Sequence, residues 1–329
     1  MPRMRAMILS AGYGTRLWPL TEDRTKPALP ILGKPLVGYV AEYLARFGCN
    51  DIVVNLHYRP DSVKRALGDG SRFGVKLTYV EEPVILGTSG ALDNARSLLE
   101  GDTFIVINGK IITDIDLGAA LKTHRETGAL ATMVLLPNAR RERFSMVEVS
   151  DGRIVRFAGM PDPNHSAAEA SPWMFTGIHI FEPRIFDYIP RGIFSDSVTD
   201  VYPRAIASGE CVSAHAGQGT WYELSTIQRY LEISLRLLAQ QGLSIFAGPA
   251  SDIASTASVD ESILWDGVTI GQDARVSRAI IGDGVHIPNG AVIENCAVVR
   301  HSLIAGSVPP LKALKGEQKG ENFVVPLGQ

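Results

Sequence analysis

The stretch Leu9-Ser-Ala-Gly-Tyr-Gly-Thr-Arg16 decides the fold of this chain. The run that leads into it, Met4 to Leu9, is mostly apolar and predicts a β-strand, and Gly12 and Gly14 follow at once. Glycine lets the backbone approach a phosphate closely, and successive N–H groups in such a turn bind anions. The arginine that ends the stretch and Lys26 add two cations. The sequence therefore predicts a strand followed by a turn that grips a triphosphate.

Short β-rich runs alternate with helical patterns over the first 240 residues. Residues 51–56, 75–80 and 103–107 are apolar runs that predict strands, and apolar residues recur at helical spacing between them. This alternation is typical of βαβ units, in which ligands bind at the carboxyl ends of parallel strands. Residues 146–158 alternate apolar and polar residues around Asp151-Gly152, which predicts a hairpin. The expected fold is α/β, with a Rossmann-like mixed, mostly parallel sheet.

A six-residue pattern appears after residue 250. Similar apolar segments begin at residues 268, 274, 285, 291 and 297, so the steps are six residues except for one of 11. A period of six is typical of a parallel β-helix, in which each coil packs on the next; an ordinary strand-rich extension is the alternative. We divide the chain into a domain at 1–243, a short left-handed β-helix at 244–308 and a tail at 309–329.

Composition and charge exclude several classes of protein. The 329 residues are 45% hydrophobic and 20% charged, which excludes dominant disorder. Cys49, Cys211 and Cys296 are too few for a disulfide scaffold and too scattered for a zinc site, so we interpret them as buried packing residues. The net charge of −3 disfavours nucleic acid as a partner. No apolar run is long enough for a membrane span or a signal peptide, so we expect no membrane partner and a cytoplasmic location.

Several motifs, in this order along the chain, resemble those of the sugar-1-phosphate nucleotidyltransferases, also called nucleotide-sugar pyrophosphorylases. The G-x-G-T-R, P-L-T and K-P signature of that family matches Gly12 to Lys26 closely. Further matches are Gly68–Gly74, Leu86–Leu92, Asn108-Gly109, Phe175–His179 and Trp221–Glu223. The resemblance covers roughly residues 1–240, and hexapeptide tails are common in the family. The Leu86-Gly-Thr-Ser-Gly90 stretch is most similar to mannose-1-phosphate or heptose-1-phosphate guanylyltransferases.

The resemblance implies a glycosyltransferase-A-like fold and a nucleotidyl transfer. A sugar 1-phosphate attacks the α-phosphorus of a nucleoside triphosphate, with GTP and mannose 1-phosphate favoured, and gives an NDP-sugar and pyrophosphate. Positioning and charge neutralisation supply most of the rate in such a reaction, with Arg16 and Lys26 as the catalytic cations. By the same resemblance the nucleotide-binding residues are Leu9, Ala11, Gly12, Gly14, Thr15, Arg16, Gly87, Thr88, Asn108, Gly109 and Lys110, and the sugar-binding residues are Glu148, Thr176 and Gly177.

The family's metal-binding pattern is altered at two positions. The family reads Asn-Gly-Asp, with Mg²⁺ on the Asp, whereas this chain has Lys110 there, and a protonated lysine cannot ligate a metal. The family's second Asp, after a Trp, is Glu223, which is longer by a methylene, and Mg²⁺ is strict about geometry. Glu223 and Asp114 are the remaining candidate metal ligands. Residues such as Asp114 and Asp116 more often cap the next helix.

The sugar-phosphate motifs are altered as well, which leaves two classes of function open. Glu-Lys-Pro is Gly159-Met160-Pro161, and Tyr-Gly is Phe144-Ser145. The run Arg140–Arg143 is either a solvated loop or a substitute for the lost lysine. The chain is either an active enzyme, in which Lys110 replaces part of the metal's charge, or an inactive nucleotide-sugar-binding subunit of an active homologue. A third hypothesis is that the chain is a structural scaffold that binds no ligand. We expect a homo-oligomer through the β-helix, or a hetero-oligomer with an active homologue.

Four aromatic side chains near the motifs have either a role in the site or a role in the core. His179 alternates with Ile178 and Ile180, so it either faces the site or is a structural histidine. His57 either edges the nucleotide cleft or is a loop histidine. Trp18 and Trp221 lie near the motifs, and we expect both to have packing roles.

Overall fold

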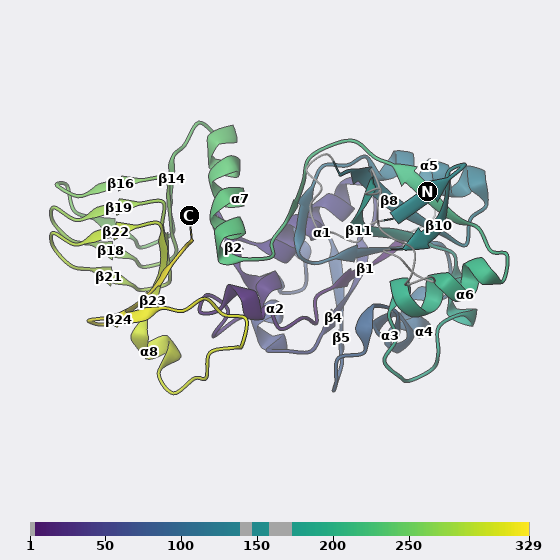
Figure 1. Cartoon of the computed structure of the whole chain (residues 1–329), viewed down its shortest axis with the longest axis horizontal. Coiled ribbons are helices and arrows are strands. Elements are labelled where there is room, and N and C mark those ends of the chain that lie inside the picture. The colour runs from purple at the N-terminus through teal and green to yellow at the C-terminus, as the bar shows by residue number, and fades with distance from the viewer. Residues whose placement is uncertain (1–3, 139–146, 158–172, 329) are drawn as a thin grey trace. The chain divides into compact units, whose positions relative to one another are not determined.

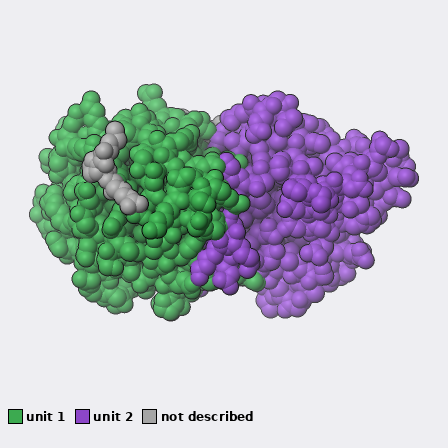
Figure 2. Space-filling model, turned by 180° about the vertical axis from the view of Figure 1, so that it is seen from behind, with its two compact units in different colours: residues 1–12, 37–60, 67–221 green, residues 13–36, 61–66, 222–329 purple. Residues whose placement is uncertain are grey.

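The computed structural model of the chain describes residues 4–138, 147–157 and 173–328 (Figure 1). The motif positions at 140–145 and 159–161, and with them Met160, lie outside the described residues. The chain forms two compact units, which Figure 2 distinguishes by colour. Unit 1 comprises residues 1–12, 37–60 and 67–221, and unit 2 comprises residues 13–36, 61–66 and 222–329. The chain therefore passes from unit 1 to unit 2 between Gly12 and Tyr13, inside the predicted phosphate turn.

A nine-stranded mixed sheet forms the centre of unit 1, in the order β5-β4-β1-β6-β11-β8-β12-β10-β9. The first four strands are all parallel, and β12 is parallel to β8, whereas β11 is antiparallel to both of its neighbours. The strands are β1 (Arg5–Leu9), β4 (Asp51–Leu56), β5 (Lys76–Glu81), β6 (Phe104–Asn108), β8 (Ala131–Pro137), β9 (Val147–Ser150), β10 (Arg153–Phe157), β11 (Trp173–Phe181) and β12 (Val212–Ala216). The Rossmann-like α/β fold is thus confirmed.

Burial explains why these segments form strands. Successive residues of β1 and β6, Ala6–Ile8 and Phe104–Ile107, are at most 1% exposed, as expected for parallel strands covered on both faces. The predicted hairpin is confirmed: β9 and β10 pair in antiparallel fashion across Asp151 and Gly152, whose φ angles of 50° and 72° fit a tight hairpin turn.

Helices connect the strands, and their ends follow the local sequence. Asp116 caps the helix α5, because its carboxylate accepts a bond from the amide of Ala119 at 3.1 Å, and Gly128 ends that helix with φ 58°. No helix in the described part of the chain is long and apolar enough to cross a membrane. The α-helices are α1 (Leu36–Arg46), α2 (Pro60–Leu67), α3 (Gly87–Asn94), α4 (Arg96–Leu99), α5 (Leu117–Thr127), α6 (Tyr202–Ala207), α7 (Ile227–Gln240) and α8 (His301–Ile304). Short 3-10 or π turns are η1 (Thr15–Leu17), η2 (Lys26–Ala28), η3 (Ser71–Phe73), η4 (Pro183–Asp187) and η5 (Ser197–Val201).

Unit 2 contains the parallel β-helix that the six-residue pattern predicts (Figure 1). Ile245 pairs with Ser262, Ile263 with Ile280 and Ile280 with Ala297, so one coil is 17 residues long. The apparent 11-residue step contains a strand, β20, that the pattern missed. The strands stack in three sheets: β14 (Ile245–Ala247), β17 (Ser262–Leu264), β20 (Ile280–Ile281) and β23 (Cys296–Arg300); β15 (Asp252–Ile253), β18 (Thr269–Ile270) and β21 (His286–Ile287); β16 (Ser258–Asp260), β19 (Arg275–Ser277) and β22 (Val292–Glu294).

Residues 317–326 form two strands within the segment 309–329, which the sequence predicts to be a tail. The strands β24 (Glu317–Lys319) and β25 (Asn322–Pro326) continue the sheet, with β25 antiparallel to β23. Val324 and Val325 are buried, so this apolar strand covers the edge that β23 would otherwise expose. The compact units also group residues 13–36 and 61–66 with the β-helix, whereas the boundary expected from the sequence follows chain order.

Short two- and three-residue strands complete the described elements: β2 (Pro30–Ile31), β3 (Lys34–Pro35), β7 (Ile111–Thr113) and β13 (Trp221–Glu223). Cys49 and Cys296 are buried packing residues, as predicted, whereas Cys211 is only partly buried. Burial raises the pKa of the Cys49 thiol to about 12 and that of Cys296 to about 11, so both are protonated at neutral pH.

Candidate functional site

Three parallel strands of unit 1 end level with one another. Leu9 of β1 pairs with Asn55 of β4 on one side and with Asn108 of β6 on the other. The amide of Gly109 donates to the carbonyl of Leu9 at 2.9 Å, which extends the contact one residue past the strands. The structure therefore brings Leu9, Asn108, Gly109 and the backbone of Lys110 together at the carboxyl edge of the sheet, where α/β proteins bind ligands.

A buried chain of hydrogen bonds crosses the same edge. The amide of Ser10 donates to Asn55 Oδ1 at 2.7 Å, and Asn55 Nδ2 donates to Glu82 Oε1 at 2.6 Å. The other carboxylate oxygen of Glu82 accepts from the amide of Leu86 at 3.1 Å. Ser10, Asn55 and Glu82 are each only 3% exposed. This network ties the start of the phosphate turn to Leu86, the residue that precedes α3 with Gly87 and Thr88, and no local sequence pattern indicates it.

The Ser10 hydroxyl is a second unusual group at this edge. Its Oγ is buried and has no hydrogen-bond partner among the described residues. A side chain at Gly109 would place its Cβ 2.5 Å from that Oγ, so position 109 requires glycine. Buried polar atoms nearly always have a partner, and exceptions of this kind call for a ligand, a water or a functional role.

Gly87 and Thr88 are fixed by the segment Ser195–Ser197. Gly87 has φ 77°, and a Cβ there would lie 2.4 Å from the carbonyl oxygen of Ser195, so only glycine fits. The Thr88 hydroxyl donates to Asp196 Oδ2 at 3.0 Å and accepts from the amide of Ser197 at 2.8 Å. This segment therefore fixes the start of α3 and engages the Thr88 hydroxyl, which the family resemblance assigns to nucleotide binding.

The phosphate turn divides between the two units. Gly12 ends the unit 1 segment and is exposed, with no described heavy atom within 4 Å of where its Cβ would stand. Gly14, in unit 2, has φ 69°, and a Cβ there would lie 3.1 Å from Lys26 Cβ, so Lys26 packs directly beside this glycine. Arg16 is exposed in η1, while Ala11, Thr15 and Lys26 are partly exposed.

The expected sugar-binding residues have different environments. Thr176 is fully buried. Its hydroxyl donates to the carbonyl of Val134 at 2.7 Å, and its backbone carbonyl accepts from Trp221 Nε1 at 2.9 Å. In this structure the Thr176 side chain therefore has a packing and hydrogen-bonding role within the fold. Gly177 has φ 85°, and a Cβ there would lie 2.3 Å from Asn108 Nδ2, so this glycine makes room for the asparagine. Glu148 is exposed, with Arg156 Nε 3.9 Å from its carboxylate.

The candidate magnesium ligands are engaged in the fold or buried in this structure. Asp114 uses a carboxylate oxygen to accept from the amide of Thr220, and Asp116 caps α5. Glu223 is buried, 8% exposed. Nowhere in the described ranges do three His, Cys, Asp or Glu side chains form a group that could hold a metal ion. Lysine at position 110 offers no ligand to a metal while it is protonated.

His179 and Trp18 are core residues rather than site residues. His179 is 4% exposed, lies against the rings of Phe175 and Phe181 and bonds to the Tyr202 hydroxyl. Burial lowers its pKa from 6.5 to about 3. Trp18 is 4% exposed and packs edge-on against Phe323 with a centroid distance of 5.6 Å, which confirms its packing role. His57 Nδ1 lies 2.8 Å from the carbonyl oxygen of Glu82, so it borders the buried network.

Known proteins share both parts of this architecture. The model of the nucleotidyl transferase family matches residues 5–240, and that of the GlmU-like C-terminal hexapeptide matches residues 244–304. A UTP–glucose-1-phosphate uridylyltransferase of Synechocystis is 31% identical over 91% of this chain and 84% of its own length. An N-acetylmuramate α-1-phosphate uridylyltransferase of Neisseria meningitidis is 35% identical over 70% of this chain and 96% of its own.

Two further proteins extend the comparison. A mannose-1-phosphate guanylyltransferase of Mycobacterium tuberculosis is 28% identical over 88% of this chain and 82% of its own length. The crystal structure of HddC from Yersinia pseudotuberculosis, complexed with GMP-PN, superposes with a TM-score of 0.61 at 21% identity over 71% of this chain and 99% of its own. At that identity the structural likeness bears on the fold alone.

The buried network yields a first prediction. Replacing Asn55→Ala removes one acceptor and one donor, so we expect a stability loss of about 1–3 kcal/mol and weaker nucleotide binding. Urea unfolding and calorimetric titration with GTP and UTP measure the two effects. Asn94→Ala is the control, because Asn94 also donates from Nδ2, to the Glu81 carbonyl at 3.2 Å, but is exposed. A nucleotide affinity of Asn55→Ala equal to that of the wild type and of Asn94→Ala would contradict a role of the network in nucleotide binding.

His179 yields a prediction about pH. Because its folded-state pKa lies below 6.5, the unfolded chain binds a proton that the folded chain does not, and stability falls as the pH drops from about 6.5 towards 3. Replacing His179→Asn keeps a polar atom near Tyr202 and removes this titration, so the unfolding free energy should depend less steeply on pH between 4 and 6.5. The exposed His286→Asn is the control. An unchanged slope in His179→Asn would count against this assignment.

Proposed function

Because the chain belongs to the nucleotidyl transferase family, we propose that it is an active sugar-1-phosphate nucleotidyltransferase. A phosphate oxygen of the sugar 1-phosphate attacks the α-phosphorus of a nucleoside triphosphate. The bond between that phosphorus and the oxygen bridging to the β-phosphorus breaks, and pyrophosphate leaves. The observation that carries the proposal is the carboxyl edge of β1, where an exposed and unobstructed Gly12 follows the buried Ser10–Asn55 contact.

The chain's own groups suit this reaction, since little covalent chemistry is required of the protein. Backbone amides of the turn after β1 bind phosphate oxygens, with Gly12 leaving room for their approach. Arg16 supplies a planar cation and Lys26 a point charge, and both neutralise charge on the departing pyrophosphate. Holding the two substrates in line supplies much of the remaining rate.

We propose GTP and mannose 1-phosphate as the substrate pair. The support is the Leu86–Gly90 stretch and a guanylyltransferase relative that spans most of the chain. UTP is the competing nucleotide, because the two relatives of higher identity are named uridylyltransferases. Gly87 and Thr88 begin α3, where we place the base, and their fixed backbone favours recognition of the base by N–H and C=O groups.

Lys110 takes the place of the family's metal-binding carboxylate in this proposal. In the family the magnesium ion neutralises phosphate charge, and a lysine ammonium supplies positive charge at the same end of β6. Lys110 directly follows Gly109, whose amide bonds to the last carbonyl of β1. Its backbone is therefore fixed next to the start of the phosphate turn, within unit 1.

The alternative is a nucleotide-sugar-binding subunit without turnover. The same Lys110 favours it, because the change converts an anion into a cation at the position where the family binds its metal. Such a subunit binds nucleotide or NDP-sugar through the intact turn and docks on an active homologue. Binding without pyrophosphate release separates this alternative from the proposed enzyme.

The proposed activity predicts pyrophosphate release that depends on Arg16. Purified protein is mixed with each nucleoside triphosphate, several sugar 1-phosphates and Mg²⁺, and pyrophosphate is measured. Arg16→Ala should lower the rate by about 10²-fold or more, because it removes a charge that stabilises the transition state. Arg65→Ala, an exposed arginine of α2, should leave the rate unchanged. Absence of release in the wild type, despite measurable binding of GTP or GDP-mannose, would favour the non-catalytic subunit.

Lys110 has a test of its own. Replacing Lys110→Asp restores the family's carboxylate, so activity or nucleotide binding should become more dependent on Mg²⁺ concentration. Lys122→Asp is the matched control, because the Lys122 side chain lies on α5 and is 75% exposed. A metal response identical in wild type and Lys110→Asp would argue against position 110 acting on the phosphates.

A further inference from the structure

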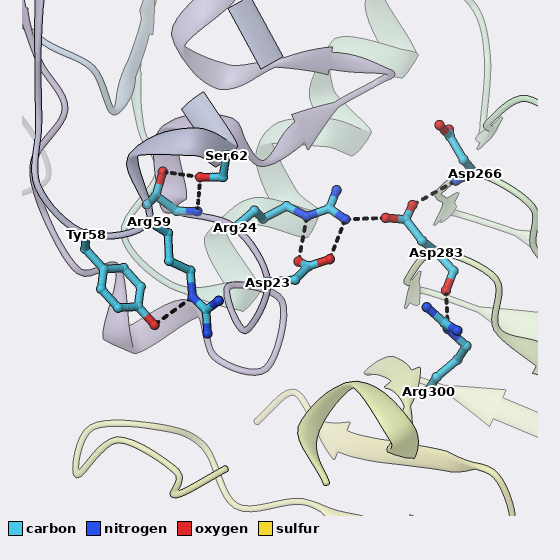
Figure 3. Close-up of polar contacts among 9 residues, drawn as sticks. Asp23, Arg24, Tyr58, Arg59, Ser62, Asp266, Asp283 and Arg300 are labelled. Carbon is cyan, nitrogen blue, oxygen red and sulfur yellow. Dashed lines mark hydrogen bonds and ion pairs between the residues drawn. The ribbon is translucent and has the colours of Figure 1, made fainter. Parts of the chain in front are cut away.

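Arg24 connects the unit 2 segment that carries Arg16 and Lys26 to the β-helix (Figure 3). Its Nε and Nη2 donate to the two carboxylate oxygens of Asp23 at 2.8 and 3.0 Å, and Nη2 also donates to Asp283 Oδ2. The guanidinium carbon lies 5.0 Å from the ring centroid of Trp265, which is the arrangement of a cation–π contact. All four residues belong to unit 2. The Arg24 side chain is 22% exposed, so these contacts are partly shielded from water.

The β-helix holds Asp283 in place through successive coils. The amide of Asp266 donates to Asp283 Oδ1 at 3.2 Å, and Arg300 Nε donates to the Asp283 carbonyl at 3.0 Å. These three residues are 17 positions apart, so they occupy equivalent places on three stacked coils (Figure 3). The acceptor for Arg24 is therefore part of a regular ladder rather than of a loose loop.

Three further contacts hold the segment 13–36 against α7 and the strands of the β-helix region, all within unit 2. The Tyr230 hydroxyl of α7 donates to the carbonyl of Pro30 and accepts from Trp265 Nε1 at 2.8 Å. Gly33 has φ 76°, and a Cβ there would lie 3.0 Å from Phe246 Cζ, so the backbone packs on that ring. Trp18 packs against Phe323 of β25. The segment 13–36 is thus attached at four places, and Lys26 lies between two of them.

The backbone around Lys26 has little freedom as a result. The amide of Thr25 donates to Ser62 Oγ at 3.1 Å, and the amides of Ala28 and Leu29 donate to the carbonyls of Thr25 and Lys26 at 3.0 and 3.1 Å. Arg24 immediately precedes this hydrogen-bonded turn. Movement of Arg24 would therefore shift the turn and change where the lysine ammonium lies.

We propose that Arg24 is a positioning residue for nucleotide binding, which fastens the turn bearing Lys26 to the β-helix through Asp283 and Trp265. The proposal rests on the proposed function, in which Lys26 binds the triphosphate. Arg24 acts through the backbone and not on the nucleotide. Because catalytic groups must be held to within a fraction of an ångström, the β-helix then sets nucleotide affinity as well as stability.

The test uses full-length Asp283→Asn and Arg24→Lys, with Glu261→Gln as the control. Asp283→Asn removes the charge and keeps the shape, while Arg24→Lys removes the planar fork and its stacking on Trp265. Glu261→Gln opens the ion pair between Arg278 Nη1 and Glu261 Oε2, which is 2.8 Å long, joins two coils 17 positions apart and does not involve residues 13–36. Circular dichroism and melting temperature establish that each variant is folded.

Two readouts separate positioning from plain stabilisation. The first is the calorimetric Kd for GTP and UTP, together with KM for each substrate. Asp283→Asn and Arg24→Lys should raise Kd and KM for the triphosphate by about tenfold and leave KM for the sugar 1-phosphate within about twofold. The second is hydrogen exchange of the amides of Ala28 and Leu29 in nucleotide-free protein, which should become faster. Glu261→Gln should change neither readout.

The outcomes are distinguishable. Faster exchange and weaker triphosphate binding in a protein that releases no pyrophosphate would support the positioning role and reject the proposed turnover. Unchanged exchange and triphosphate affinity in Asp283→Asn and Arg24→Lys would overturn the positioning role and leave the turnover standing. A lower melting temperature with unchanged Kd would assign these contacts to stability alone and would also overturn it. A wild type that binds no triphosphate overturns both proposals.

Discussion

The parallel pairing of β1 with β4 and β6 is the constraint on which unit 1 depends. Because Leu9 lies opposite both Asn55 and Asn108, three strands end at one level, and the segments that follow them start side by side. The asparagine at the end of β4 can then accept the amide of Ser10, and Gly109 can bond to Leu9. A slip of one residue in this register would turn these side chains to the opposite face and separate the groups.

The position of Arg16 and Lys26, the two cations of the phosphate turn, depends instead on contacts within unit 2. A flexible loop carrying Arg16 and Lys26 would lose conformational entropy on meeting a triphosphate, at a cost of about 1–2 kcal/mol for each residue that becomes ordered. In unit 2 that ordering is already present, since side chains of α7 and of the β-helix hold Trp18, Arg24 and Pro30. The 17-residue ladder of the β-helix is suited to this task, because each coil is fixed by its neighbours.

Elements of this fold that depend on neighbouring residues can be predicted from the sequence, whereas contacts between distant residues cannot. The strand before Leu9, the hairpin at Asp151-Gly152 and most coils of the β-helix were predicted, because periodicity and turn residues are local signals. The bonds from Asn55 to Glu82 and from Arg24 to Asp283 join residues 27 and 259 positions apart, so no local pattern indicates them. At Thr176 a local motif is not sufficient: the motif indicates a sugar contact, whereas in the fold the hydroxyl is buried and donates to the carbonyl of Val134.

The charge at position 110 decides how the phosphates must be held in an active enzyme. A metal ion neutralises charge and also fixes the directions of its ligands, whereas a lysine ammonium is a point charge on a flexible stem. If Lys110 supplies the charge, the directional part must come from rigid backbone, such as the amides after β1 and the bond from Gly109 to Leu9. Lys26 is a second flexible point charge, so its contribution also depends on the backbone that carries it, which hydrogen bonds to Ser62 and within the turn hold in place. The substitution at 110 and the attachment of Arg24 to the β-helix thus belong to one physical argument about preorganised charge.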